Sequence, residues 1–156
     1  MESAGLRVLT GAPPGDPGNL VTRDFPPPSV RYVLRIRASF EAEHHLVSYK
    51  GVPETPHGHS WQVEVCLVAE ALDREGMAFD FVEVRQQLES LVRPFDRGDL
   101  NRLPPFDAVS PTAEHLAAWL LAELRARLPH AGIDAVTVWE GPDCSATCQI
   151  LEENHR

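Results

Sequence analysis

The sequence is short of lysine, of cysteine and of long apolar runs, and each shortage excludes a class of protein. Lys50 is the only lysine among 156 residues, and Lys plus Arg number 14 against 23 Asp plus Glu. The formal net charge of -9 lacks the basic footprint that general binding to nucleic acid or another polyanion requires. No apolar run is long enough to span a membrane, and no charged-then-apolar signal segment follows Met1.

Cysteine is too scarce for a fold that depends on disulfides. The chain has Cys66, Cys144 and Cys148, so one thiol must remain unpaired, and 156 residues can bury a sizeable core without cross-links. The hydrophobic fraction of 43% and the charged fraction of 24% are typical of a soluble globular domain. We therefore expect a cytoplasmic protein that binds neither nucleic acid nor membrane.

Proline and glycine are concentrated at the N-terminal end of the chain. They occupy most positions in 11–18 and all of 26–28. At this density they disfavour both regular helix and ladder pairing. We expect residues 1–29 to form a mobile or surface-draped arm and residues 30–156 to form a single domain.

Alternation of apolar and polar residues predicts strands on both sides of a helical middle section. Apolar residues occupy every second position from Tyr32 to Phe40 and again from Trp61 to Leu67, which is typical of strands with one buried face. Two further strands are expected around 133–140 and 145–151, because a Gly-Pro-Asp turn separates two short apolar runs.

Two helices are predicted between these pairs of strands. Asp80 is the expected N-cap of the first helix, which ends at Arg93 because a proline follows that residue. The second helix is expected to begin with Ser110 as its cap and Pro111 at the first helical position, and to end before Pro129. The order strand, strand, helix, helix, strand, strand predicts an α+β fold.

Three histidines form the most informative constellation in the sequence. His57 and His59 are one residue apart, so an extended backbone projects both side chains to the same side. If the alternation continues to the strand ends, His44 has the parity of Phe40, and the histidine pair has the parity of Trp61. A lone histidine on an apolar face is usually a hydrogen-bonded core residue. Three in phase favour a catalytic zinc site with an open fourth position.

Two carboxylates are candidates for the same site. Glu140 has the parity of Val138, and a carboxylate aimed into an apolar layer is costly unless a partner or a ligand pairs with it. Glu54 lies three residues before His57 in a loop rich in proline. The alternative for each is an inert solvated acid, in the loop or at the strand end.

Arginines occupy the opposite face of the first strand. Arg31, Arg35 and Arg37 could guide an anionic substrate. Cross-strand charge pairs with residues such as Glu64 are the favoured interpretation, because neighbouring side chains of opposite charge on a sheet face stabilise the sheet.

Several motifs in a fixed order resemble a known family. They are Phe40-Glu41-Ala42-Glu43-His44-His45-Leu46, His57-Gly58-His59, Phe79-Asp80-Phe81, Asp96 to Asn101, Pro111-Thr112-Ala113-Glu114 and Val138-Trp139-Glu140. From about Arg31 onward, the chain resembles the 6-pyruvoyltetrahydropterin synthase and 6-carboxytetrahydropterin synthase family. The resemblance implies the tunnelling fold, an antiparallel four-stranded sheet with two helices on one face. It also implies trimeric barrels stacked as hexamers, active sites at subunit interfaces, and 7,8-dihydroneopterin triphosphate as substrate.

The resemblance also implies a role for each site residue. His44, His57 and His59 correspond to the ligands of a Zn²⁺ ion. Glu140 corresponds to the acid that anchors the pterin ring by accepting hydrogen bonds from its amino and ring N–H edge. Thr112 resembles part of the segment that lines the pterin pocket from the next subunit.

Two departures from the family pattern bear on the reaction. The two named activities use a cysteine in the loop before His57, and this chain has Glu54 there, as in a subgroup that releases 6-hydroxymethyl-7,8-dihydropterin for folate synthesis. Where the family has an Asp-His pair, this chain has Asp96 and Arg97, and arginine is a poor general base because it stays protonated.

The sequence therefore predicts a zinc-dependent pterin lyase that cleaves the side chain of dihydroneopterin triphosphate by a retro-aldol reaction. Glu54 is the predicted base. Arg97 is expected to neutralise developing charge or hold a phosphate, with Asp96 orienting it. The alternatives are 6-carboxytetrahydropterin synthase of the queuosine pathway, 6-pyruvoyltetrahydropterin synthase, and a noncatalytic paralogue that binds pterin or metal. A zinc hydrolase also fits three histidines, but it gives Glu140 no role.

Overall fold

Two long strands form the centre of the structure, a computed structural model that describes residues 6–10, 21–25 and 30–151. The strands β3 (Tyr32–His44) and β4 (His57–Ala69) pair antiparallel over their whole length, with His44 directly opposite His57. On the other side of β4, β6 (Ile133–Trp139) and β7 (Ser145–Gln149) continue the sheet antiparallel. The alternation of buried and exposed residues along β3 confirms the predicted strand phase.

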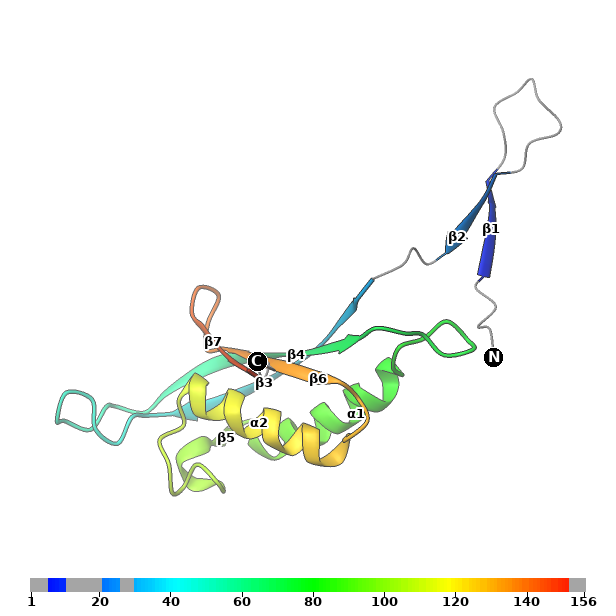
Figure 1. Cartoon of the computed structure of the whole chain (residues 1–156). Helices are drawn as coiled ribbons and strands as arrows, with labels where there is room; N and C mark the ends of the chain where they lie inside the picture. The colour runs from blue at the N-terminus through cyan, green and yellow to red at the C-terminus, as the bar shows by residue number, and fades with distance from the viewer. Residues whose placement is uncertain (1–5, 11–20, 26–29, 152–156) are drawn as a thin grey trace.

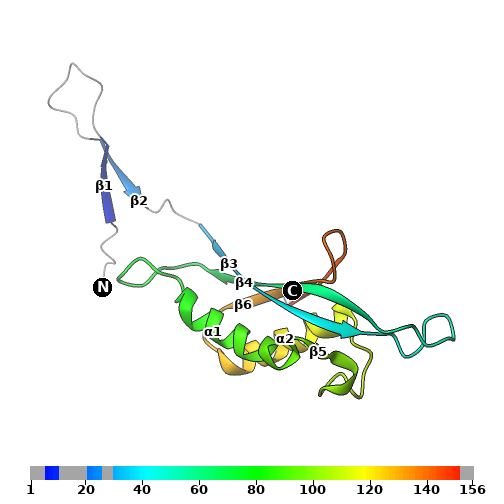
Figure 2. The ribbon, with the colours of Figure 1, turned by 180° about the vertical axis from the view of Figure 1, so that it is seen from behind.

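Two helices cover one face of this sheet, as Figures 1 and 2 show from opposite sides. The helix α1 (Phe81–Val92) begins after Asp80, whose side chain accepts from the N–H of Val82, so the predicted cap is confirmed. It is followed by a single 3₁₀ turn, η1 (Arg93–Phe95), where proline interrupts the α-helix as expected. The helix α2 (Ala113–Arg127) packs mainly on β6 and β7.

The second helix begins two residues later than predicted. Thr112, not Ser110, is the N-cap, and its hydroxyl oxygen accepts from the N–H of His115. With Pro111 outside the helix, its carbonyl is free to accept from a histidine of the site, as described below. The shift therefore releases a backbone acceptor that a helix starting at Pro111 would have used internally.

The sheet has a fifth strand that the sequence did not predict. The two-residue strand β5 (Gly98–Asp99) pairs parallel with β3 at Ala42 and Glu43, and a second 3₁₀ turn, η2 (Leu100–Arg102), follows it. Two residues are too few to show periodicity, so the pattern carried no signal for this strand. The strand order is β5-β3-β4-β6-β7.

The expectation that the N-terminal arm lacks ladder pairing is wrong for two short segments. The strands β1 (Leu6–Thr10) and β2 (Val21–Phe25) pair antiparallel with each other, and Figure 1 shows them away from the main sheet. Both strands are free of proline and glycine, whereas the punctuated stretches 11–18 and 26–28 lie outside the described residues. The boundary at residue 30 remains a prediction.

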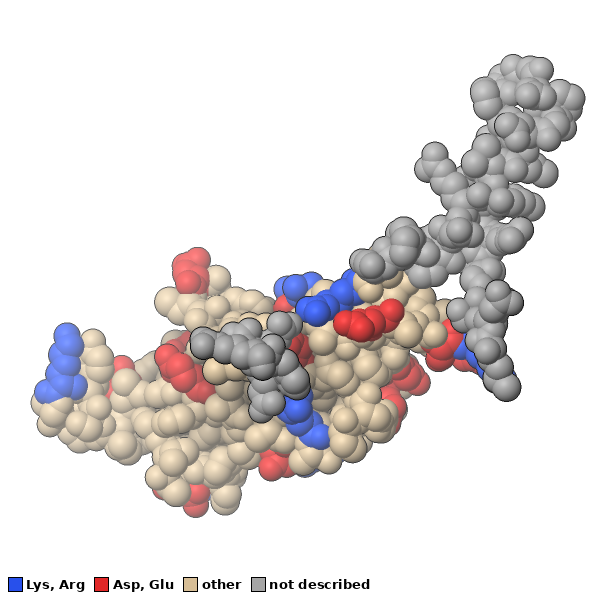
Figure 3. Space-filling model, viewed as in Figure 1, with Lys and Arg blue, Asp and Glu red and all other residues tan. Residues whose placement is uncertain are grey.

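The helix-free face of the sheet carries paired charges. Glu64, only 8% exposed, forms ion pairs with Arg37 Nη2 at 2.7 Å and with Arg35 Nε at 3.2 Å. These pairs confirm the cross-strand interpretation for Arg35 and Arg37. In the view of Figure 3, acidic and basic side chains are scattered and form no extended basic area. Within the described part of the chain, no helix is long and apolar enough to cross a bilayer.

The core lies between the sheet and the two helices. Its fully buried side chains include Trp61 from β4, Leu88 from α1, Leu120 from α2 and Val138 from β6. The strands β3 and β4, which carry the predicted histidines, and β6, which precedes Glu140, all contribute to this apolar layer, which fixes their ends relative to one another.

Replacing Leu88 tests this layer. Leu88→Ala removes a fully buried side chain and leaves a cavity, so the free energy of unfolding should fall by about 2–5 kcal/mol. The neighbouring Glu89→Ala, on the exposed side of α1, should change it by less than about 0.5 kcal/mol. Urea unfolding of both variants at equal protein concentration checks the prediction, and equal losses would contradict the layer arrangement.

Candidate metal centre

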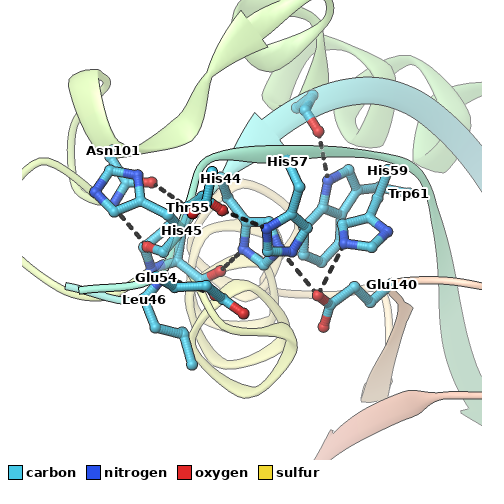
Figure 4. A network of polar contacts seen from close by, with 12 residues as sticks. His44, His45, Leu46, Glu54, Thr55, His57, His59, Trp61, Asn101 and Glu140 are labelled. Carbon is cyan, nitrogen blue, oxygen red and sulfur yellow. Dashed lines mark hydrogen bonds and ion pairs between the residues drawn. The ribbon is translucent and has the colours of Figure 1, made fainter. Parts of the chain in front are cut away.

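The three predicted histidines meet where β3 ends and β4 begins. His44 is the last residue of β3, His57 is the first residue of β4, and His59 follows two residues later on the same side. Glu140, directly after β6, joins them, as Figure 4 shows. One ligand atom from each of the four side chains can be chosen so that all lie within 4.8 Å of one another. This group could hold a metal ion.

Backbone carbonyls orient two of the rings. His44 Nδ1 lies 2.8 Å from the carbonyl oxygen of Pro111, and His57 Nδ1 lies 2.9 Å from that of Thr55. A carbonyl oxygen only accepts, so each Nδ1 must carry the proton. In the neutral rings Nε2 is then the atom with a free lone pair, which is the form that a metal requires.

The Nε2 atoms of His44 and His59 both lie close to one oxygen of Glu140. The distances to Glu140 Oε1 are 2.9 Å from His44 and 3.2 Å from His59. Both Nε2 atoms are buried, and neither makes a hydrogen bond with acceptable geometry. Buried donors and acceptors without partners are rare in native proteins. The orphaned nitrogens and the histidine-carboxylate donor set therefore fit a bound cation of the zinc type.

Trp61 forms the apolar floor of the centre. Its ring meets those of His44 and His59 edge to face, with centroids 4.9 Å and 5.7 Å away. Its indole N–H donates to the carbonyl of Ala42 at 3.3 Å, and its other neighbour is the parallel ring of Phe40. Trp61 is fully buried, so water is excluded from beneath the histidines.

Burial also acts on the charge state of His59. Desolvation lowers the pKa of this imidazole below its ordinary value of 6.5, against the opposing attraction of the Glu140 carboxylate. The nearby rings of His44 and His57 act in the same direction as burial. His59 therefore favours the neutral imidazole, which is the ligand form.

Glu54 is held rigidly beside the centre rather than lying free in solvent. The loop between β3 and β4 folds back on itself, so that Glu54 N–H donates to the carbonyl of Leu46 at 2.9 Å and Leu46 N–H donates to Glu54 Oε2 at 3.1 Å. At its tip, Lys50 and Gly51 both have positive φ, as a tight two-residue turn requires. The solvated-acid alternative is thus disfavoured.

Asp96 and Arg97 lie next to the backbone of Glu41. Asp96 Oδ1 accepts from the N–H of Glu41 at 3.0 Å, and no hydrogen bond or ion pair joins it to the Arg97 side chain in the described residues. Arg97 has a left-handed backbone with φ of 59°, and its own N–H donates to the carbonyl of Glu41. It lines a hollow of about 450 Å³ together with His59.

Asn101 is a residue that sequence reasoning missed. Its side-chain oxygen accepts from the N–H of His45 at 2.9 Å, and its side-chain nitrogen donates to the carbonyl of His45 at 2.9 Å. The side chain thus bonds, as a clamp, to both peptide groups between His44 and Leu46. His44 carries an imidazole of the site, and the N–H of Leu46 donates to Glu54. Asn101 lies in the motif from Asp96 onward, but periodicity gives no hint of the clamp.

Sequence reasoning also missed the carbonyls of Pro111 and Thr55, which accept from Nδ1 of His44 and His57. Backbone groups leave no residue-type signal, so only the three-dimensional structure reveals them. Thr112, predicted to line a pocket of a neighbouring subunit, caps α2 here, and its role across an interface remains a prediction.

Comparisons with known proteins agree with this geometry. A family profile described as 6-pyruvoyl tetrahydropterin synthase matches residues 33–150. The chain is 30% identical over 106 residues to the dihydroneopterin monophosphate aldolase of Pyrococcus furiosus, which covers 67% of this chain and 86% of that protein. It is 35% identical over 115 residues to the 6-carboxy-5,6,7,8-tetrahydropterin synthase of Synechocystis, which covers 70% and 86%.

Solved structures share the fold. The 6-pyruvoyl tetrahydropterin synthase of Caenorhabditis elegans matches with a TM-score of 0.69 at 20% identity, over 78% of this chain and 97% of that chain. That of Plasmodium vivax matches with a TM-score of 0.64 at 19% identity, over 78% and 100%. At these identities the likeness concerns the fold alone, and it confirms the predicted tunnelling fold.

Titration of His59 tests the electrostatics of the centre. In protein stripped of metal with a chelator, the pKa of His59 should lie below 6.5, and Glu140→Gln should lower it further because the attracting charge is removed. His59 then binds a proton less readily in the folded protein than in the unfolded chain. The free energy of unfolding should therefore decrease as the pH falls below 6.5. Histidine NMR signals measure the pKa, and a value above 6.5 would contradict the assignment.

Proposed function

Because the chain belongs to the 6-pyruvoyl tetrahydropterin synthase family, we propose that it is a zinc-dependent pterin lyase. Its substrate is 7,8-dihydroneopterin triphosphate, and the reaction is retro-aldol cleavage of the side chain to 6-hydroxymethyl-7,8-dihydropterin. The observation that carries this proposal is the pairing of a histidine centre with Glu54, fixed by Leu46 where the synthases have a cysteine. The relative named as an aldolase supports the same reaction class.

The cleavage needs one base and one electron sink. Removal of the proton from the second side-chain hydroxyl lets the bond between the first and second side-chain carbons break. The electron pair enters the ring imine, the first carbon then takes up a proton, and a two-carbon aldehyde leaves with the phosphate group. A bound zinc would supply charge stabilisation at the side-chain hydroxyls and the developing carbonyl.

Glu54 is the residue proposed to take the proton. Its carboxylate is anchored through one oxygen by Leu46 N–H, so the other oxygen keeps a fixed direction. The loop that carries it leads directly into His57, the first residue of β4. A general base must lie within hydrogen-bond reach of the proton that it removes, and this anchoring provides such positioning.

The roles proposed for the other site residues are those that the sequence predicts. Glu140 anchors the amino and N–H edge of the pterin ring, and Thr112 lines the pocket of a neighbouring subunit. Arg97, which lines a hollow together with His59, is proposed to hold a phosphate group or to neutralise developing negative charge. Asp96 supports Arg97 through the backbone, because both residues bond to the peptide groups of Glu41.

A second candidate is 6-carboxytetrahydropterin synthase, or the related pyruvoyl synthase activity. The relative from Synechocystis, at 35% identity, favours it. The chain has no cysteine between His44 and His57, however, and Arg97 stands where those enzymes have histidine. A noncatalytic paralogue that binds pterin or metal is the third outcome that an assay must distinguish.

Unpaired sheet edges favour a homo-oligomer. The edge strand β7 has a partner on one side only, and β5 covers β3 only at Ala42 and Glu43. Exposed edges of this length invite pairing with another chain, and barrel closure between copies removes them. We propose a cytoplasmic trimer or hexamer with active sites between subunits, which binds pterin and neither nucleic acid nor membrane.

Light scattering tests the assembly. The mass of the full chain should be three or six times 17.3 kDa across a wide concentration range. A monomer at micromolar concentration would contradict barrel formation.

Product analysis tests the reaction. The zinc-loaded protein, incubated with the triphosphate and separately with the monophosphate of dihydroneopterin, should release 6-hydroxymethyl-7,8-dihydropterin, identified by mass spectrometry. Glu54→Gln keeps an oxygen for Leu46 N–H but removes the base, so the turnover rate should fall by about 10²–10⁴-fold. Glu75→Gln, an exposed acid in the loop before α1, is the matched control and should retain the rate.

Other products would decide between the candidates. A carboxytetrahydropterin or pyruvoyl product would favour the synthase activities. Zinc and pterin binding without any product would favour the noncatalytic paralogue. A rate for Glu54→Gln equal to that of the unaltered protein would remove Glu54 from the mechanism.

A further inference from the structure

The contact between His44 and Glu140 joins two groups that both accept. Pro111 accepts the proton of His44 Nδ1, so Nε2 of the neutral ring presents a lone pair. Glu140 Oε1, itself an acceptor when ionised, lies 2.9 Å from that nitrogen. Two lone pairs at this distance repel unless a cation lies between them. A second histidine nitrogen, His59 Nε2, lies 3.2 Å from the same oxygen.

Either a proton or a metal ion could supply the positive charge. A proton on Nε2 of His44 would have to be directed at Glu140 to form a hydrogen bond. The Nε2 atoms of His44 and His59 are instead buried without any hydrogen bond of acceptable geometry. Neither nitrogen therefore forms a hydrogen bond with the carboxylate, which favours a metal ion as the source of the positive charge.

The spacing agrees with tetrahedral coordination. Zinc binds histidine nitrogen and carboxylate oxygen at about 2.0–2.2 Å, which places neighbouring ligand atoms of a tetrahedron roughly 3.3 Å apart. The two distances from Glu140 Oε1, 2.9 Å and 3.2 Å, are close to such an edge. The four candidate ligand atoms lie within 4.8 Å of one another, so modest ring movements bring all of them into range.

We propose that Glu140 is a fourth ligand of the metal ion in the protein without substrate. The inference rests on the proposed function, and it gives Glu140 two successive roles. Its carboxylate closes the coordination shell until a pterin enters. It then leaves the metal and accepts from the N–H edge of the ring, which opens a position for the side-chain hydroxyls. Substrate entry and metal activation are thus linked through one carboxylate.

Metal affinity separates this proposal from a purely pterin-binding role. Zinc affinity, measured by competition with a chelator in the absence of any pterin, should fall at least about tenfold in Glu140→Gln, because an amide oxygen is a weaker ligand. Glu140→Asp keeps the charge but shortens the reach by one methylene, so it should also lose affinity. Asp143→Asn, in the exposed turn after Glu140, removes the same charge and should retain zinc as the unaltered protein does.

Cobalt spectroscopy provides a readout that does not depend on affinity. The visible absorption of Co²⁺ in the site should differ between the unaltered protein and Glu140→Gln. Adding neopterin, an oxidised analogue that cannot react, should change the spectrum of the unaltered protein as the carboxylate leaves the metal. Circular dichroism confirms that each variant is folded.

The possible results are distinct. If both Glu140 variants bind zinc as tightly as the unaltered protein and show its cobalt spectrum, Glu140 is not a ligand and the inference is wrong. Weakened neopterin binding with unchanged zinc affinity would leave Glu140 as a ring anchor only, which overturns the inference but preserves the proposed function. Absence of zinc binding in the unaltered protein would instead overturn the proposed function.

Discussion

The antiparallel pairing of β3 with β4 is the constraint on which the site depends. Its register places His44 directly opposite His57 and leaves His59 on the same side, so three imidazoles converge, with loop carbonyls orienting two of the rings. The helix-covered face on which they lie is apolar, and Trp61 closes it from below. Nitrogen lone pairs gathered in such a place are stabilised by a cation, so the sheet register accounts for a group that could hold a metal ion.

The hydrophobic pattern was sufficient to predict this part of the structure. Strand parity carries through to the strand ends, because a half-buried strand cannot slip by one residue without exposing its whole apolar face. That parity places His44, His57 and His59 together, and it brings Glu140 into the same layer. The α+β class and the boundaries of α1 followed from period and capping for the same reason.

What the pattern could not predict depends on groups without side-chain identity or on very short segments. The helix α2 starts at Ala113 because Thr112 caps it, and the Pro111 carbonyl is therefore free to accept from His44. The two-residue strand β5 and the Asn101 clamp have no periodic signal, although both fix the backbone around the site. Pairing of β1 with β2 occurs between segments free of proline, on either side of the punctuated stretch.

The chemistry proposed for the centre thus separates into a part set by the sheet and a part set by the loop. Strands β3 and β4 supply the histidines, and Glu140 follows directly after β6. The loop supplies Glu54, held by Leu46, and this residue distinguishes the proposed cleavage from the cysteine-dependent reactions. Both parts require that a metal ion occupies the histidine centre.

X-ray diffraction at the zinc absorption edge tests that requirement most directly. Crystals of the purified full-length protein should give one strong anomalous peak per chain, within bonding distance of Nε2 of His44, His57 and His59. The absence of such a peak in protein prepared with zinc, or a peak at another group of residues, would contradict the account.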